Sequence, residues 1–424
     1  MTRIGIAQTD ITPKQSVWLT GYGHRDHKSE GVYLPLQAGA VALSSPAEDV
    51  LILTADLIGY DLGFSAAAKM QIAAATGLLP HQIVLTATHT HCAPFFYPWI
   101  MPGSVEKDYA AALFQELVHL SLAARNHQVE GRIAFSRGTS TFGVNRRMPD
   151  GKGGIIFGPN PEGPIDRALD TLWFTDREDR PLGSLSVFGC HPTSLGNYLI
   201  GGDYPGFLCR ALSDATNAPA LFATGCAGNV RPWFNKGDLS GFARPSMAEL
   251  EDASRTMAGE VLQSSRDALK VEAGAMRINT TFHQLPYTNL PTTEDLAAKA
   301  AHDSHPLQRQ WAQTMLSLAQ AGHLPHACPQ EIQLLQFNPE LSAVFLGGEI
   351  LTEIGLHIKE VLQPSTTITA AYSNGLIGYV PARETYDLGG YEVNGSHFYF
   401  LRPAPFVKEV EELIVARTVD LASS

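Results

Sequence analysis

Two histidines separated by one residue follow an apolar stretch and could together do metal chemistry. Residues 83–88 are predicted to form a buried strand, so His89 and His91 would project to the same side of an extended chain. Neutral imidazole is the commonest metal ligand, and a His-x-His pair at a strand end supplies two such groups. The pair therefore indicates a metal site, with solvated surface histidines as the alternative in a chain of 15 histidines.

Three more segments share this pattern, in which an apolar strand runs into a short turn with a residue able to bind metal or move protons. They are Cys190-His191-Pro192-Thr193-Ser194, Thr224 to Pro232, and Gly347-Gly348-Glu349. Ligands bind at strand ends in open α/β sheets. A carboxylate after a buried strand is costly unless it is paired or ligates a metal, so Glu349 favours a metal site. Two histidines and Glu349 would form the His₂Glu set of catalytic zinc, although His191 alone could be a core histidine satisfied by backbone.

Cysteine offers a rival chemistry. Cys226 lies in the glycine-containing turn and could act as a nucleophile with His91 or His191 as its base. The chain shows no Cys-His-Asn signature of a known thiol hydrolase, and buried free cysteine is usually a small apolar filler. The thiol mechanism is therefore the weaker hypothesis.

The elements that must position these residues alternate between short apolar runs and helical patterns. Strands are predicted at 50–54, 83–88, 168–174, 183–188, 218–223 and 343–346, and helices at 64–75, 105–124, 204–214 and 245–269. A helical insertion is expected at about 291–323, opened by an N-cap at Thr292 and broken by Pro306. No linker or repeat interrupts the sequence, which predicts one large α/β domain over 1–424 with a mixed sheet covered by helices.

The amino-acid composition limits the classes of molecule that the protein is expected to bind. The 424 residues carry a formal net charge of −12 without a Lys/Arg run, which argues against nucleic acid or an anionic membrane surface and favours a small-molecule substrate. No stretch approaches the roughly 18 apolar residues of a membrane helix, so we expect a cytoplasmic protein without stable membrane insertion. The five cysteines are irregularly spaced, which favours reduced thiols over a disulfide framework. The sequence does not reveal the oligomeric state.

Taken together, these segments resemble the neutral (non-lysosomal) ceramidase family in its catalytic N-terminal domain. The matching motifs run in order through nearly the whole chain: Asp10-Ile-Thr-Pro13, Gly21-Tyr-Gly23, Ala55-Asp56, Thr88-His-Thr-His91, Asn145-Arg146, His191-Pro-Thr-Ser194, Gly202-Asp203 with Gly206, Gly228-Asn-Val230, Gly348-Glu349, and Tyr379-Val380 with Glu384, Tyr386, Tyr391 and Glu392. Each motif is short, but about nine in the correct order make coincidence improbable.

The resemblance implies a zinc hydrolase. The metal ligands it implies are His89, His191, Glu349 and Tyr379. A tyrosinate ligand would require a strongly lowered pKa beside the metal. The resemblance further implies that His91 and Tyr391 stabilise the oxyanion or handle protons, and that Arg146 contacts substrate.

Two departures from the family pattern matter. Where the family has a serine with a nucleophile-like role, this chain has Arg231, in the turn Gly228-Asn-Val-Arg-Pro232. An arginine cannot attack a carbonyl, but its guanidinium can clamp a carboxylate, a phosphate or a developing oxyanion. The chain also stops at Ser424, so we expect it to lack the secretion signal and the C-terminal immunoglobulin-like domain of those enzymes. Membrane-embedded ceramide is accordingly not the expected substrate.

We therefore expect a zinc-dependent hydrolase that cleaves an amide (N-acyl) bond of a soluble small molecule by metal-activated water, with His91, Tyr391 and Arg231 as catalytic groups. Arg146 and Arg231 would bind the substrate. Asp203 could orient a ligand histidine, or serve instead as a helix N-cap. One alternative keeps the zinc site but cleaves an ester, lactone or glycosidic bond of a polar or anionic substrate. A second alternative is a non-catalytic, metal-stabilised binding protein.

Overall fold

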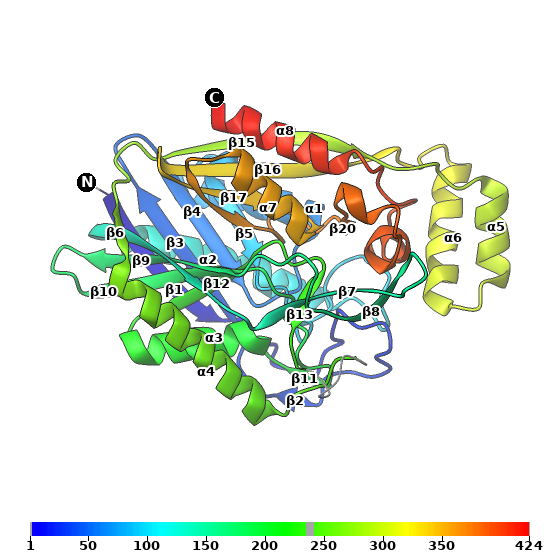
Figure 1. Cartoon of the computed structure of the whole chain (residues 1–424), viewed down its shortest axis with the longest axis horizontal. Helices are drawn as coiled ribbons and strands as arrows, with labels where there is room; N and C mark the ends of the chain where they lie inside the picture. Colours follow the sequence, from blue (N-terminus) through cyan, green and yellow to red (C-terminus); the bar gives the residue numbers. More distant parts are fainter. Residues whose placement is uncertain (1, 235–240, 424) are drawn as a thin grey trace.

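A nine-stranded mixed sheet dominates the computed structural model, which describes residues 2–234 and 241–423 (Figure 1). Its strands are β1 (Thr2–Asp10), β3 (Gln37–Ser44), β4 (Asp49–Ala55), β5 (Ile83–Ala87), β6 (Val129–Thr139), β9 (Ala168–Asp176), β10 (Pro181–Phe188), β12 (Ala220–Thr224) and β14 (Leu269–Val271). The order is β12-β10-β9-β6-β1-β3-β4-β5, and β14 pairs with β6. β4–β5 and β10–β12 are parallel, whereas β1–β3 is antiparallel, which confirms the predicted mixed sheet.

A second sheet packs face to face against the first. Its four strands are β15 (Arg277–Pro286), β16 (Ala327–Asn338), β17 (Leu341–Leu346) and β19 (Thr366–Ala370). Alternation along β4 sends Ile52 toward this sheet, where it joins one apolar cluster with Leu335 and Phe345, while Leu51 and Leu53 face the opposite way. The sequence analysis missed β15 and β16 and with them this second layer.

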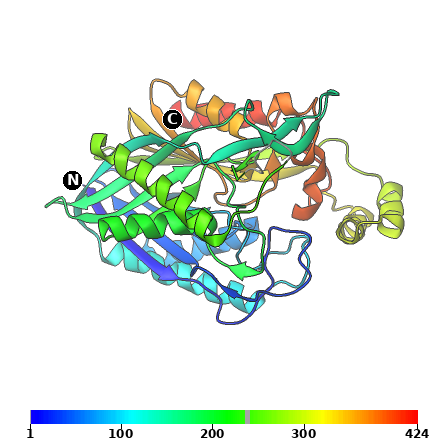
Figure 2. The same ribbon diagram turned by 60° about the horizontal axis from the view of Figure 1, so that its bottom comes forward.

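Helices cover both outer faces and complete an α/β/β/α arrangement (Figures 1 and 2). They are α1 (Leu62–Thr76), α2 (Lys107–Asn126), α3 (Asp203–Thr216) and α4 (Met247–Ser264) on the large sheet, and α7 (Thr352–Val361) and α8 (Val410–Ser423) on the second. Ser246 starts α4 through a capping box with Glu249. The structure is thus a single mixed α/β domain.

The expected helical pair is present as α5 (Thr293–His302) and α6 (Pro306–Gln320), which project away from the sheets (Figure 2). A capping box between Thr292 and Asp295 opens α5, and Pro306 lies at the start of α6. The pair is inserted between β15 and β16, and Trp311 packs beside Phe398 in a small apolar cluster of its own.

The turns singled out in the sequence converge at one end of the domain. Short strands there are β2 (Gly31–Val32), β7 (Gly143–Pro149), β8 (Ile155–Asn160), β11 (Leu199–Ile200), β13 (Val230–Pro232), β18 (Glu349–Ile350) and β20 (Tyr379–Val380), with the helical turns η3 (Arg383–Thr385), η4 (Tyr391–Gly395) and η5 (His397–Phe400). Two other turns are η1 (Pro80–Gln82), which leads into β5, and η2 (Ser265–Asp267), which follows α4. The Thr224 hydroxyl after β12 donates to the Thr88 carbonyl after β5 at 2.6 Å. The Ala371 N–H after β19 donates to the Thr224 carbonyl at 3.0 Å, which ties the two sheets together beside the site.

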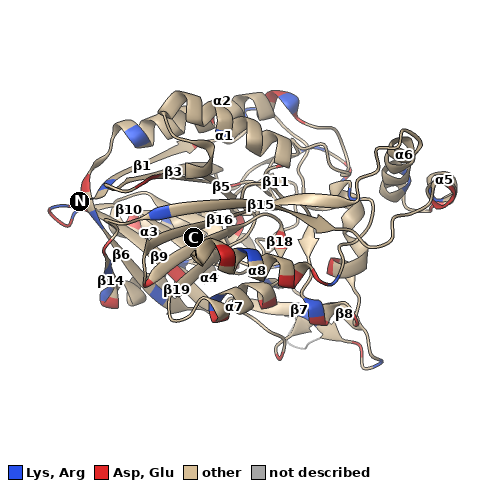
Figure 3. Ribbon diagram, turned by 90° about the horizontal axis from the view of Figure 1, so that it is seen from above, with Lys and Arg blue, Asp and Glu red and all other residues tan. Residues whose placement is uncertain are grey.

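Charged residues are scattered over the elements, and basic residues do not gather on one face (Figure 3). Among the described residues, no helix combines the length and the apolar character needed to cross a membrane.

Candidate metal centre

Three imidazoles meet at the ends of β5 and β10. His89, His91 and His191 are 0%, 9% and 0% exposed, and each has a ligand atom within 4.8 Å of the others. The Glu349 carboxylate, 3% exposed, joins them from β18: its Oε2 lies 3.2 Å from His89 Nε2 and 2.9 Å from His191 Nε2. Four side chains from three separate motifs therefore surround one point.

Backbone carbonyls fix the orientation of all three rings. The Nδ1–H groups of His89, His91 and His191 donate to the carbonyls of Ile58 at 2.6 Å, Gly21 at 2.9 Å and Ala227 at 2.5 Å, respectively. With the proton assigned to Nδ1 by these bonds, each Nε2 carries a lone pair directed at the centre. This is the arrangement in which a carbonyl orients a metal-ligating histidine from behind.

Without a cation, these inward lone pairs oppose one another. His89 Nε2 and His91 Nε2 lie 3.4 Å apart, and neither has a proton to donate to the other or to Glu349. Burial lowers the pKa of His191 to about 4, assisted by Arg146, and burial with the neighbouring imidazoles holds the pKa of His91 well below its ordinary value. Adding protons is therefore unfavourable, and the donor set fits a divalent metal ion.

Tyr379 completes the group expected from the sequence. Its hydroxyl lies 3.2 Å from His191 Nε2, and Arg146 Nη2 donates to it at 3.0 Å. Burial raises the pKa of Tyr379, and the Arg146 charge opposes that rise. Arg146 Nε also donates to Glu392 at 2.8 Å, and Arg147 binds the same carboxylate at 2.7 Å. Arg146 is thus a buried side chain that supports Tyr379, and its contact with substrate stays a prediction.

Backbone conformation explains why these residue types occur here. His89 sits at φ +65°, which turns the chain sharply after β5, so strict strand alternation does not continue through the pair. Gly21 has φ +91°, and a Cβ there would lie 2.4 Å from His91 Nδ1. Only glycine lets this carbonyl approach the imidazole so closely.

Arg231 lies on β13 and is clamped between aromatic rings. Its guanidinium carbon is 4.2 Å from the Phe242 ring centroid and 5.6 Å from that of Phe157, and Nη2 donates to the Thr193 carbonyl at 3.0 Å. Its Nε is buried and has no hydrogen-bond partner among the described residues. Thr193 follows His191 by two residues, so Arg231 contacts the loop that carries one of the imidazoles.

Two further candidate site residues lie farther from the three imidazoles. Tyr391 stacks edge-on against Tyr379 at 5.4 Å between ring centroids and is 41% exposed, so it lies on the open side of the centre. Asp203 does not orient a ligand histidine: its carboxylate accepts the N–H groups of Leu195 at 3.1 Å and Tyr204 at 2.7 Å. Carbonyls orient the imidazoles instead.

The cysteine hypothesis loses its chemical basis. Cys226 is 3% exposed within the apolar core, where burial raises the pKa of its thiol to about 12. The thiolate is the nucleophilic form, so this residue is unreactive near neutral pH. His191 Nε2 lies 2.9 Å from Glu349 Oε2 and His91 Nε2 lies 3.4 Å from His89 Nε2, so both nitrogens face the proposed metal centre.

Sequence reasoning did not assign roles to two residues that shape the centre. The Tyr372 ring lies 4.1 Å from the His89 ring between centroids and is 1% exposed. Arg25 is 2% exposed and donates to the His91 carbonyl at 2.8 Å and the Asn197 carbonyl at 3.0 Å. Neither residue stands in a strand-end turn with metal ligands, so the pattern that located the other residues gave no signal for them.

Comparisons with known proteins agree with the resemblance seen in the sequence. Neutral ceramidases of Drosophila pseudoobscura pseudoobscura and Drosophila melanogaster are each 26% identical in an alignment of 260 residues that covers 56% of this chain. The crystal structure of the neutral ceramidase from Pseudomonas aeruginosa matches with a TM-score of 0.77 at 19% identity, covering 99% of this chain and 74% of that chain. The expected family resemblance and mixed α/β fold are confirmed.

The alignments cover only part of the length of each relative. The aligned regions span 36% of each Drosophila protein, so the chain covers about a third of the length of these curated relatives. No protein-family model matches the chain.

Proposed function

Because the chain is neutral ceramidase-like in sequence and fold, we propose that it is a zinc-dependent hydrolase that cleaves an amide (N-acyl) bond of a small molecule. One observation carries the proposal: three buried imidazoles have their Nδ1–H groups bonded to backbone carbonyls, and the Nε2 atoms of His89 and His191 lie against Glu349 while that of His91 lies against His89. The five unpaired cysteines are compatible with the cytoplasmic location that remains part of the proposal.

The residues that would hold zinc are His89, His191, Glu349 and Tyr379. Nitrogen and carboxylate ligands suit zinc, and a fourth, oxygen ligand from Tyr379 lies within reach of the same imidazole. When bound, zinc would supply Lewis-acid polarisation of the scissile carbonyl and would acidify water. Arg146 would assist by holding the Tyr379 oxygen in its ionised form, because its guanidinium already donates to that oxygen.

His91 is assigned to proton transfer. Its Nδ1–H is committed to Gly21, so the free Nε2 can accept a proton from attacking water and return it to the leaving amine. The low pKa of this imidazole keeps it neutral before the reaction. Tyr391, on the open side of the centre, would donate its hydroxyl proton in a hydrogen bond to the developing oxyanion.

A second candidate reaction keeps the same centre but changes the substrate. Arg231 has a buried Nε without a partner among the described residues, and it replaces the serine that the family resemblance implies at this position. A guanidinium with free donors favours recognition of an anionic or otherwise polar group. This observation supports cleavage of an ester, lactone or glycosidic bond in a polar or anionic substrate as the alternative.

The test is a substrate screen with zinc-loaded protein. N-acyl amino acids, neutral N-acyl amines, lactones and glycosides would be assayed in parallel, with Arg231→Met as the matched variant. We expect turnover of N-acyl compounds, and a loss of about 10-fold or more for anionic substrates alone in Arg231→Met. Turnover confined to lactones or glycosides would support the alternative reaction. Full zinc occupancy without turnover of any class would instead indicate a metal-stabilised binding protein.

A further inference from the structure

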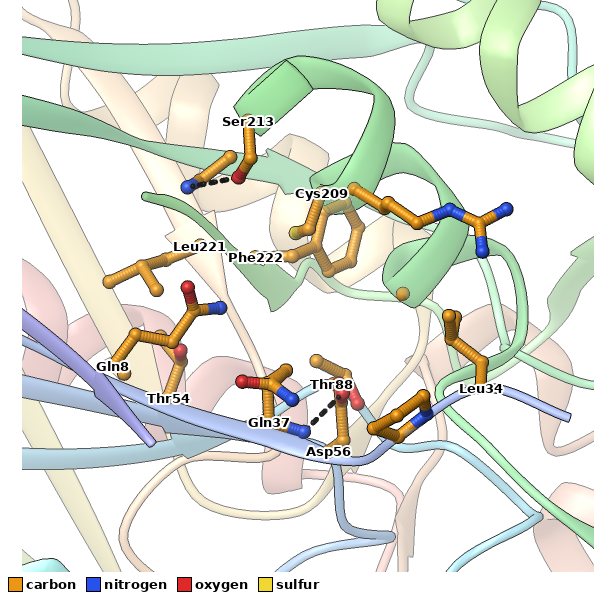
Figure 4. Close-up of a pocket in the computed structure, with 15 residues that line it drawn as sticks. Gln8, Leu34, Gln37, Thr54, Asp56, Thr88, Cys209, Ser213, Leu221 and Phe222 are labelled. Carbon is orange, nitrogen blue, oxygen red and sulfur yellow. Dashed lines mark hydrogen bonds between the residues drawn. The ribbon is translucent and has the colours of Figure 1, made fainter. Parts of the chain in front are cut away.

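A cavity of about 300 Å³ opens beside the large sheet, and none of the proposed metal ligands lines it, although Thr88 in its lining directly precedes His89. Figure 4 shows it between α3 and the strands β1, β3 and β4. Exposed Gln8, Pro35 and Arg210 form its rim, while Thr54, Asp56 and Thr88 lie buried at its floor. Its volume is at the lower end of the range for small-molecule sites.

The floor holds one carboxylate that lacks a cation. Asp56 is 5% exposed, and its Oδ2 accepts the Gln37 N–H at 2.9 Å. No ion pair of Asp56 occurs within residues 2–234 and 241–423, and the rim cation Arg210 is already bound to Glu251 at 2.8 Å. Burial raises the pKa of Asp56 to about 6 against the lowering effects of Gln37 and Thr88, which leaves an ionised carboxylate at neutral pH.

Beside the rim cation Arg210 and a largely apolar wall that includes Leu34 and Phe222, the lining holds a few neutral groups able to form hydrogen bonds. The side-chain amides of Gln8 and Gln37 extend toward the cavity, and the Ser213 hydroxyl lies on the opposite wall (Figure 4). Such groups serve hydroxyl or amine groups of a ligand equally well. A ligand that carries a positive charge and forms hydrogen bonds could neutralise the Asp56 carboxylate and pair with these polar side chains at the same time.

We propose that this cavity binds a small organic ammonium compound, with its charged nitrogen against Asp56 and its other polar atoms near Gln8 and Gln37. A bare metal cation fits less well, because Asp56 is the sole carboxylate among the described residues of the lining and hard cations take six or more oxygen ligands. An anion would meet the uncompensated charge of Asp56. The inference does not depend on the function of the metal centre.

Ethanolamine is a suitable probe, with ethylene glycol and glycolate as its neutral and anionic counterparts. Binding would be measured by thermal shift and calorimetry at pH 7.5 and constant ionic strength. We expect ethanolamine alone to bind, and Asp56→Asn to weaken it about 10-fold or more. Glu349→Gln, which alters the metal centre, should bind ethanolamine as the wild type does. Equal binding of ethylene glycol, or undiminished binding by Asp56→Asn, would overturn the proposal.

A second measurement needs no variant and decides the matter if Asp56→Asn does not fold. Cys209 lines the cavity and is partly exposed, whereas the other four cysteines are buried. Because burial raises the pKa of the Cys209 thiol, methyl methanethiosulfonate would be used in excess at pH 9 to modify Cys209 in the wild-type protein, followed by mass spectrometry. Ethanolamine should slow this modification and ethylene glycol should not. An unchanged rate at saturating ethanolamine would overturn the proposal.

Discussion

Two buried glutamates show how differently this fold treats a charge in its interior. Glu331 on β16 is 7% exposed and meets Lys69 of α1, whose Nζ donates to it at 2.7 Å. Glu349 is 3% exposed and meets two imidazole Nε2 atoms whose ring protons are committed elsewhere. The chain supplies the counter-charge of Glu331 but supplies only neutral lone pairs around Glu349.

The difference separates a structural ion pair from a ligand site. A buried carboxylate next to a lysine is satisfied within the protein, and removing either partner damages stability. A buried carboxylate among inward-facing imidazole lone pairs is satisfied only when a cation joins them. Substitutions at the two sites should therefore affect different properties of the protein.

The largest expected effect is on catalysis. Glu349→Gln preserves side-chain volume but removes the proposed ligand charge, so kcat/KM should fall by about 10³-fold or more, since one misplaced electrostatic group can already cost about 10²–10³. Steady-state assays on the best substrate from the screen would measure it. Glu331→Gln is the matched control and should retain kcat/KM; a comparable loss there would erase the distinction between the two sites.

The next effect is on stability. Lys69→Met leaves Glu331 buried without its cation, so the free energy of unfolding should fall by about 3–5 kcal/mol. Urea denaturation would measure this loss, and Lys69→Met/Glu331→Leu should recover most of it by making both positions apolar. Metal content should stay unchanged in both variants. A fully stable Lys69→Met protein would show that the ion pair is not structural.

Asp56 is a third buried carboxylate, and among residues 2–234 and 241–423 it is paired with neither a lysine nor an imidazole. Its ionisation should therefore be visible in the pH dependence of stability. Its pKa rises from 3.8 to about 6 on folding, so between these values the folded state binds more protons than the unfolded state. Its contribution to stability should therefore fall by about 2 kcal/mol as pH rises from 4 to 7. Asp56→Asn should remove this component. The unfolding free energy of the variant minus that of the wild type should therefore increase as pH rises. A pH-independent difference would contradict it.

A smaller effect should separate His91 from the metal ligands. A Cβ in Gly21→Ala would lie 2.4 Å from His91 Nδ1, so the ring must move while His89 and His191 keep their own carbonyl partners. We expect kcat to fall by about 10–100-fold with metal content retained. Elemental analysis and single-turnover rates would test this. Loss of metal from Gly21→Ala would indicate that His91 is itself a metal ligand, which would contradict its assignment to proton transfer.

The positions of the chemical groups were readable from the sequence because each stands where an apolar strand gives way to a short turn. His89, His191 and Glu349 were found in this way, and the structure brings them together. The groups that orient them were not readable, since every residue has a carbonyl and only the fold selects those of Ile58, Gly21 and Ala227. Tyr379 came from the family resemblance alone.

The fold shows the same division. Strands such as β5 and β12 are continuous apolar runs and were predicted within a few residues. The hairpin of β15 and β16 was missed because α5 and α6 separate the two strands in sequence, and β15 carries polar residues on one face. The contact of Arg146 with Glu392 was not readable because the two residues lie 246 positions apart, a distance that no local pattern bridges.

Metal analysis of the wild-type protein beside His89→Ala and His91→Ala tests the central claim most directly. We predict stoichiometric zinc in the wild type and in His91→Ala, and loss of zinc from His89→Ala, because only His89 of the pair contacts Glu349. Retention of stoichiometric zinc by His89→Ala would contradict the account of this centre.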